Sequence, residues 1–132
     1  MSLVLDTHAV IWYLLDDRRL PNKVFELIES SEKRRQPVFV SAITLVEIIY
    51  LVERGRVLPD IYDRLVSELN QDDSVLFPAA VDADVVEKLR KIPRDSVPDM
   101  PDRIIVATAL HLGLPLVTRD RQLQNLGIQT IW

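Results

Sequence analysis

Cysteine is absent from this chain of 132 residues, and its absence limits the chemistry open to the protein. Without thiols there is no disulfide bond and no zinc–thiolate centre, and an intracellular setting is the natural expectation. Histidine is scarce too, because His8 and His111 are the whole supply, so a histidine-rich zinc site is not expected. Any bound metal would be held by oxygen atoms, which favours Mg²⁺ or Mn²⁺.

Long apolar runs are also missing. No segment approaches the roughly 20 apolar residues that span a bilayer, and the first residues have neither a basic start nor an apolar run long enough for a signal peptide. We therefore expect a cytoplasmic protein with no membrane partner. The formal net charge of −4 argues against a large basic surface for nucleic acid. It does not exclude a nuclease, because a bound metal would cancel much of the charge of a carboxylate-rich site.

What the chain does contain is the composition of a folded domain. With 48% hydrophobic and 27% charged residues, disorder is not expected, and we assign residues 1–132 to a single domain. Apolar segments predict strands at 2–5, 37–40, 75–77, 114–117 and 128–131. Helical patterns lie between them, at 7–15, 20–32, 42–54, 59–69, from Asp82 or Asp84 to just before Pro93, at 102–112 and at 120–126. Strands of this kind, alternating with helices, indicate a three-layer α/β/α fold around a parallel sheet.

Three acidic residues stand near the carboxyl ends of these strands, where functional residues gather in open α/β sheets. Asp6 follows the first strand directly, and Asp120 lies just past the strand that ends at Val117. Asp102 is expected in the first turn of its helix and can point toward the same edge. Each also has a purely structural interpretation: Asp6 as a helix N-cap, Asp102 as a partner of the helix dipole, and Asp120 as a turn or cap residue.

Glu47 is the most diagnostic acid because it lies about two turns into its helix, where no capping role applies. Its neighbours from Ala42 to Ile49 are nearly all apolar, and a carboxylate there is costly to bury without a partner. Four convergent carboxylates would repel one another unless a cation joined them. One or two Mg²⁺ or Mn²⁺ ions would make the arrangement coherent and would suit hydrolysis of a phosphodiester.

Four segments carry a resemblance to a known family. They are Leu3-Val4-Leu5-Asp6-Thr7-His8, Ser41-Ala42-Ile43-Thr44-Leu45-Val46-Glu47-Ile48, Asp99-Met100-Pro101-Asp102-Arg103-Ile104-Ile105-Val106-Ala107-Thr108-Ala109 and Leu116-Val117-Thr118-Arg119-Asp120. In this order and spacing the chain resembles the PIN-domain ribonucleases, and among them the VapC-like toxins of toxin–antitoxin systems. The resemblance covers nearly the whole chain.

That resemblance implies a PIN-like fold with four or five parallel strands and an endoribonuclease dependent on Mg²⁺ or Mn²⁺. It places the family's catalytic, metal-binding acids on Asp6, Glu47, Asp102 and Asp120, of which Asp120 occupies the most variable position. It also implies an RNA substrate, a small antitoxin protein as partner, and frequent homodimers. Asp99 is an auxiliary candidate or else a turn residue. Thr118 matches a family hydroxyl, or else it bonds its own backbone at the strand end.

Several other residues have open interpretations. Arg103, Arg119 and Arg121 flank the acids and could hold substrate phosphates, or they are ordinary surface arginines. His8 could act as a base, although packing or capping is the simpler role. Trp12 and Tyr13 could stack on bases, but on an amphipathic helix they fit the core or a subunit contact better.

Two other functions remain alternatives to the ribonuclease. One is a PIN-like domain that binds or scaffolds without catalysis. The other is a phosphoacceptor receiver domain, which usually needs an acidic pair after the first strand and a lysine near the last. Here Thr7 follows Asp6, and no lysine occurs after Lys91, so the receiver is the weaker alternative.

Overall fold

The computed structural model describes the backbone of residues 1–132 and the side chains of residues 1–123 and 126–132. Its centre is a five-stranded parallel sheet with the order β3-β2-β1-β4-β5, in agreement with the predicted fold class. The strands are β1 (Leu3–Leu5), β2 (Val38–Ser41), β3 (Leu76–Ala79), β4 (Leu116–Val117) and β5 (Thr130–Ile131). The α-helices are α1 (Thr7–Leu14), α2 (Asn22–Lys33), α3 (Ala42–Glu53), α4 (Asp60–Asn70), α5 (Ala83–Leu89) and α6 (Met100–Leu112), and a 3₁₀ helix, η1, spans Arg121–Leu126.

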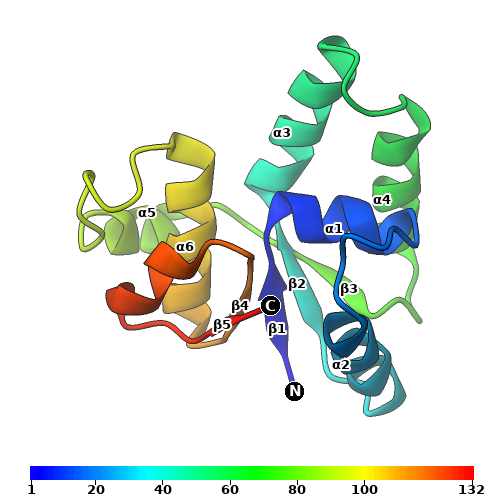
Figure 1. Ribbon diagram of the computed structural model, residues 1–132, viewed down its shortest axis with the longest axis horizontal. Helices are drawn as coiled ribbons and strands as arrows, with labels where there is room; N and C mark the ends of the chain where they lie inside the picture. Colours follow the sequence, from blue (N-terminus) through cyan, green and yellow to red (C-terminus); the bar gives the residue numbers. More distant parts are fainter.

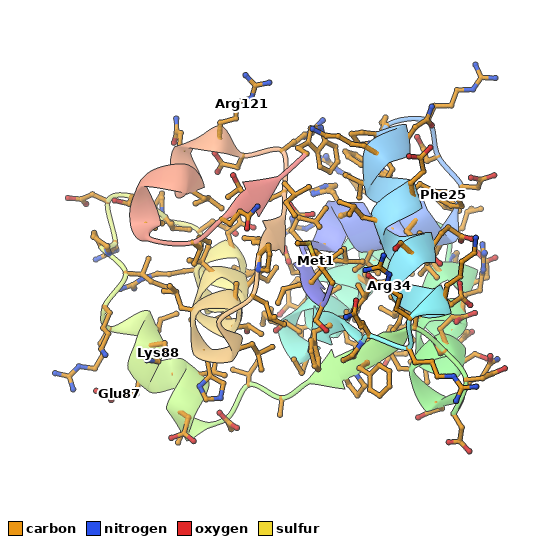
Figure 2. All side chains as sticks on the ribbon, turned by 90° about the horizontal axis from the view of Figure 1, so that it is seen from below. Met1, Phe25, Arg34, Glu87, Lys88 and Arg121 are labelled. Atoms are coloured by element: carbon orange, nitrogen blue, oxygen red, sulfur yellow. The ribbon has the colours of Figure 1, made fainter. Side chains whose placement is uncertain are left out.

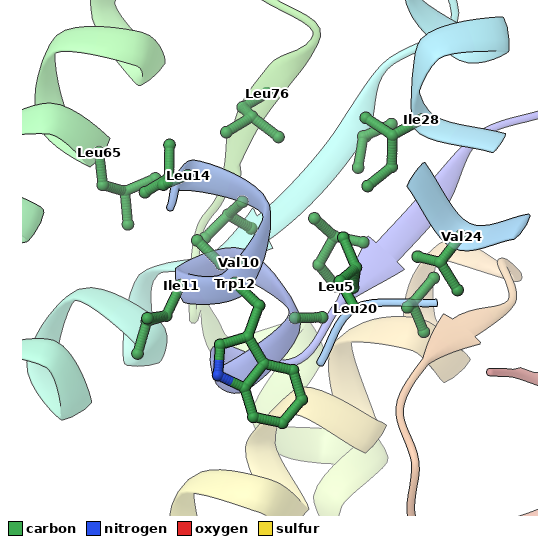
Figure 3. Packing of buried hydrophobic residues seen from close by; sticks show 14 of the residues in the cluster. Leu5, Val10, Ile11, Trp12, Leu14, Leu20, Val24, Ile28, Leu65 and Leu76 are labelled. Carbon is green, nitrogen blue, oxygen red and sulfur yellow. The ribbon is translucent and has the colours of Figure 1, made fainter. Parts of the chain in front are cut away.

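The sheet separates two hydrophobic cores, because alternate side chains of a strand point to opposite faces. Leu3 and Leu5 of β1 pack with α1, α2 and α4, whereas Val4 packs with α5, α6 and η1. Figure 1 shows α5 and α6 on one side of β1 and the α1, α2 and α4 helices on the other. Figure 3 shows the first core closely, with Val10 and Leu14 of α1 among its members.

Helix ends follow local capping chemistry. Asp6, Ser41, Asp82 and Asp99 each accept a hydrogen bond from a backbone N–H in the first turn of the helix that follows, as N-cap residues do. At its other end α6 stops at Gly113, whose φ of 66° lies in the left-handed region that glycine adopts without a Cβ penalty. No helix among the described residues is long and apolar enough to span a membrane.

The structure corrects the boundaries of two predicted elements near the acids. Helix α6 begins at Met100, with Pro101 in its first turn, and not at Asp102. Proline is tolerated there because first-turn N–H groups have no intrahelical partner. The segment 120–126 is a 3₁₀ helix that begins at Arg121, and Asp120 is its cap. Asp99, which the sequence pattern left outside the helix, is therefore the N-cap of α6. Asp120, which the pattern placed inside the last helix, is the cap of η1.

Candidate active site

The candidate site lies where the order of the strands reverses. From β1 the chain crosses to β2 on one side, while β4 lies on the other side of β1. Open α/β sheets bind ligands at this switch point, outside the carboxyl ends of the strands. The register pairs Leu5 with Val117, and the Asp6 N–H donates to the Val117 carbonyl at 3.1 Å. Asp6 and Thr118 therefore leave adjacent strands side by side.

A small pocket of about 160 Å³ opens at this edge of the sheet. Its polar lining joins the ends of β1 and β4 to the start of α6, and consists of Asp6, His8, Asp102, Thr118, Arg119 and Asp120. In Figure 1 the starts of α1 and α3 and the yellow, N-terminal end of α6 lie at the same end of the sheet. Three of the four predicted acids thus share one pocket.

Asp6 is a helix cap and also lies in the candidate pocket. Its Oδ1 accepts a hydrogen bond from Ala9 N at 2.9 Å, which makes it the N-cap of α1. It also lines the acidic pocket. Burial raises the pKa of Asp6 above 3.8, against the opposing effect of hydrogen bonds from Ala9 and Thr118. A carboxylate can serve as cap and ligand together, because it has two oxygen atoms.

Glu47 reaches the site from the second turn of α3 and is half-buried. The Thr7 hydroxyl donates a hydrogen bond to its Oε1. Burial raises the pKa of Glu47, and the negative charges of Asp99 and Asp6 raise it further, whereas the Thr7 bond lowers it. The predicted cost of a carboxylate in this apolar helix is therefore real, and protein hydrogen bonding offsets only part of it.

Asp99 and Asp102 lie one turn apart at the start of α6. Asp99 Oδ2 accepts a hydrogen bond from Asp102 N at 3.1 Å, so Asp99 is the helix cap. One oxygen atom from each of Glu47, Asp99 and Asp102 lies within 4.8 Å of the other two. Desolvation raises the pKa of Asp102 to about 7, and the neighbouring charges of Asp99 and Glu47 add to the rise. The structure thus brings Asp99 into the cluster together with Asp102.

Asp120 lines the pocket from its place as the cap of η1. Its Oδ1 accepts from Gln122 N at 3.0 Å, and its own N–H donates to Thr118 Oγ1 at 3.2 Å. Both structural interpretations, the cap for Asp120 and the local backbone bond for Thr118, are therefore present. Asp120 also lines the pocket, together with Asp6 and Asp102. Among the described side chains it is not part of the closest oxygen cluster.

The three arginines near the acids differ in where their side chains lie. Arg119 lines the pocket, and its guanidinium lies 5.0 Å from the centre of the Trp12 ring. Arg121 extends away from the molecule in Figure 2. Arg103 does not reach the site, because its Nη2 donates to the carbonyls of Leu89 and Ile92 at 3.2 and 2.8 Å. The phosphate-binding role considered for Arg103 is replaced by a structural one: it fastens the end of α5 to α6.

His8, which lines the pocket, forms an aromatic pair with Trp12. Their ring centres are 5.5 Å apart and the planes are tilted by 47°. Trp12 is only 3% exposed, which supports the core interpretation and leaves little surface for stacking a base. His8 is exposed and lines the pocket. Its charge lowers the pKa of both Asp6 and Glu47, so packing and an electrostatic effect on the acids coincide.

Sequence reasoning missed Thr7 and Thr44 as parts of the site. Both side chains are buried, and their hydroxyl oxygens lie 3.0 Å apart. A signal was available for Thr44, which stands three residues before Glu47 and so lies on the same face of α3. The signal for Thr7 was weaker, because a threonine after a capping aspartate is ordinary.

The cluster fits a hard divalent cation. Its donors are carboxylate oxygens, which Mg²⁺ and Mn²⁺ prefer. Without a cation, desolvation and then the neighbouring charges of Asp99 and Glu47 raise the pKa of Asp102 to about 7, so full ionisation of the cluster is unfavourable. Glu47, Asp99 and Asp102 would hold the ion, and Asp6 and Asp120 line the adjoining pocket. A bound cation would supply positive charge and Lewis acidity at a phosphodiester.

Comparison with known proteins gives matches over nearly the whole chain. The family model described as the PIN domain matches residues 3–129. Ribonuclease VapC22 of Mycobacterium tuberculosis is 28% identical over 124 residues, which cover 94% of this chain and 91% of that protein. The structure of VapBC2 from Rickettsia felis, bound to a DNA fragment from its promoter, has a TM-score of 0.74 at 17% identity and covers 99% and 98% of the two chains. A toxin–antitoxin complex from Klebsiella pneumoniae has a TM-score of 0.68 at 21% identity, with 99% and 97% covered.

Proposed function

This chain belongs to the PIN-domain family, and from that membership and the acidic site we propose that it is a metal-dependent endoribonuclease, the toxin of a toxin–antitoxin pair. The observation that carries the proposal is the convergence of acids from α3 and α6, with one oxygen each of Glu47, Asp99 and Asp102 within 4.8 Å of the others. Such a cluster is unfavourable without a cation and is suited to Mg²⁺ or Mn²⁺.

In the proposed reaction the acids, Arg119 and Thr118 have different roles. Glu47, Asp99 and Asp102 bind one or two cations, and Asp6 and Asp120 complete the acidic edge from β1 and β4. Arg119 lines the pocket, and its guanidinium suits an RNA phosphate. Thr118 donates to Asp6, and this hydrogen bond opposes the rise in the pKa of Asp6 that burial causes. The substrate is RNA, in a single-stranded or structured region.

Cleavage of RNA in the presence and absence of metal tests this function. The purified protein should cleave RNA with Mn²⁺ or Mg²⁺, and a chelator should stop it. Asp102→Asn should reduce the rate at least 100-fold, the scale of losing a main electrostatic group. Asp60→Asn changes an exposed acid in the first turn of α4 and is the matched control, which should cleave normally. If no RNA is cleaved under any metal condition, or if Asp102→Asn cleaves as well as the control, the proposal fails.

The catalytically silent binding module is the alternative that the same experiment decides. Binding of Mn²⁺ and of RNA without any product would favour it. The receiver domain is disfavoured by topology, because receivers have the strand order 2-1-3-4-5, and this sheet has β3-β2-β1-β4-β5.

The proposed partners are a small antitoxin protein and a second copy of this chain. The antitoxin is supported by the solved structure from Klebsiella pneumoniae, which is described as a toxin–antitoxin complex. Association with a second copy is supported by exposed apolar side chains on α3, namely Val46, Ile49 and Tyr50. Co-purification with the product of a neighbouring small reading frame tests the first partner. Sedimentation of the wild type against Tyr50→Glu tests the second.

A further inference from the structure

Two buried threonines form a hydroxyl chain that ends on Glu47. Thr7 is the first residue of α1, and Thr44 lies in the first turn of α3. Their side chains are 4% and 0% exposed. Thr7 Oγ1 lies 3.0 Å from Thr44 Oγ1 and donates to Glu47 Oε1. These hydrogen bonds therefore link the first residue of α1, just after β1, to Glu47 on α3.

The direction of the chain follows from the number of protons. A threonine hydroxyl has one proton to donate, and an ionised carboxylate can only accept. Because Thr7 gives its proton to Glu47, its bond with Thr44 must run the other way, with Thr44 donating to Thr7. Every hydrogen bond then has one donor and one acceptor. The arrangement is complete only when Glu47 supplies an acceptor oxygen at this position.

We propose that Thr7, oriented by Thr44, is a positioning residue that fixes the Glu47 carboxylate toward Asp99 and Asp102. This inference rests on the metal site of the proposed function. The Thr7 bond holds Oε1 in place, and the carboxylate keeps further acceptor sites for a cation at the acidic cluster. A long glutamate side chain otherwise samples many rotamers, and partners that fix the orientation of a ligand contribute much of the affinity of a metal site. Neither threonine touches the substrate in this role.

Isosteric substitutions separate positioning from packing. Thr7→Val and Thr44→Val keep the buried shape and remove a hydroxyl, whereas Thr7→Ser keeps the hydroxyl and removes a methyl group. Thr108→Val is the matched control, because Thr108 is also buried but donates only to the Ile104 carbonyl of its own helix. The double variant Thr7→Val/Thr44→Val removes both hydroxyls together, so no unpaired donor is left in the core.

Two readouts on the whole protein test the proposal. Calorimetric titration with Mn²⁺ should show affinity roughly 10-fold weaker in Thr7→Val, the lower end of the cost of losing a group that orients a ligand. Thr7→Ser should restore most of it, and Thr108→Val should match the wild type. In the Glu47→Ala background, Thr7→Val should have no further effect, because it acts through Glu47. A metal-free readout is the carbon-13 resonance of the Glu47 carboxyl, which should move in Thr7→Val and stay unchanged in Thr108→Val.

The outcomes keep this inference distinct from the proposed function. If the wild type binds Mn²⁺ but cleaves no RNA, the proposed function fails and the titration still decides the role of Thr7. If no Mn²⁺ binds at all, the proposed metal site is refuted, and the carbon-13 resonance of the Glu47 carboxyl alone tests the role of Thr7. The inference is overturned if Thr7→Val and the double variant match Thr108→Val in the measured readouts, or if the losses persist in the Glu47→Ala background.

Discussion

Replacing Asp102 by asparagine should stabilise the metal-free protein, although it removes a residue of the proposed active site. In the folded chain the pKa of Asp102 rises from 3.8 to about 7 through desolvation and the charges of Asp99 and Glu47. Between these pH values the folded state holds a proton that the unfolded state has lost. The free energy of unfolding therefore falls as pH rises through this window. Asparagine carries no charge, so the free energy of unfolding of Asp102→Asn does not fall in this way as pH rises.

The size of the effect follows from the same pKa. At face value a rise of this extent corresponds to about 4 kcal/mol. Asp102 is exposed, and solvent screens such interactions, so we expect a gain of about 1 kcal/mol at pH 8. For a chain of this length that is a rise in melting temperature of roughly 3–5 °C. At pH 5, which lies inside this window, the gain should be smaller than at pH 8, and it should vanish only below pH 3.8, where the unfolded side chain is also protonated.

Thermal or urea unfolding with a chelator, at pH 5 and pH 8, measures this difference. Asp60→Asn is the control, because it removes an acid from a helix first turn away from the cluster. It should lose a few tenths of a kcal/mol at pH 8 through the helix dipole, the opposite sign to Asp102→Asn. Added Mn²⁺ should stabilise the wild type and leave Asp102→Asn almost unchanged. A stability loss in Asp102→Asn at pH 8, or an equal effect at both pH values, would refute the reasoning.

Three further predictions follow from the site. Binding of Mn²⁺ should release more protons at pH 6 than at pH 8, because the pKa of Asp102 is about 7. Calorimetry in buffers of different ionisation enthalpy measures the number of protons released, and an equal number at both pH values would contradict the prediction. Arg103→Lys should lower the free energy of unfolding by roughly 1–2 kcal/mol through weakened bonds to the Leu89 and Ile92 carbonyls, with unchanged Mn²⁺ affinity by titration. Arg119→Ala should raise KM for RNA by roughly 10-fold in steady-state cleavage assays, whereas the outward-pointing Arg121→Ala should leave KM unchanged.

The strand pattern was predictable because it depends on local properties. The central strands β1 and β4 are short buried apolar runs that Asp6 and Thr118 follow, and a parallel sheet covered on both faces allows such runs without polar residues. The predicted α/β class and the number of strands agree with the structure. The start of α6 was less predictable. Asp99 and Asp102 both precede helical residues, and which of them caps the helix depends on the backbone angles of the segment between them.

The sequence by itself determined that acids would meet at one edge of a sheet. Asp6 and Asp120 follow β1 and β4, and parallel strands end at the same edge, so their convergence is a consequence of chain order and helix–strand periodicity. It also marked Glu47, since a carboxylate in an apolar helix needs a partner. These inferences require only spacing and residue type.

Only the tertiary structure decided which side chains actually touch. Asp99 joins Glu47 and Asp102 because α3 and α6 approach each other at their starts, a distance that no local pattern contains. Arg103 points away from the site because the Leu89 carbonyl at the end of α5 and the Ile92 carbonyl just after it accept its hydrogen bonds. Thr7 reaches Glu47, forty residues away, because β1 and β2 pair in register and direct the chain into α1 and α3 from the same edge. Contacts between distant segments depend on packing, and packing is a property of the whole fold.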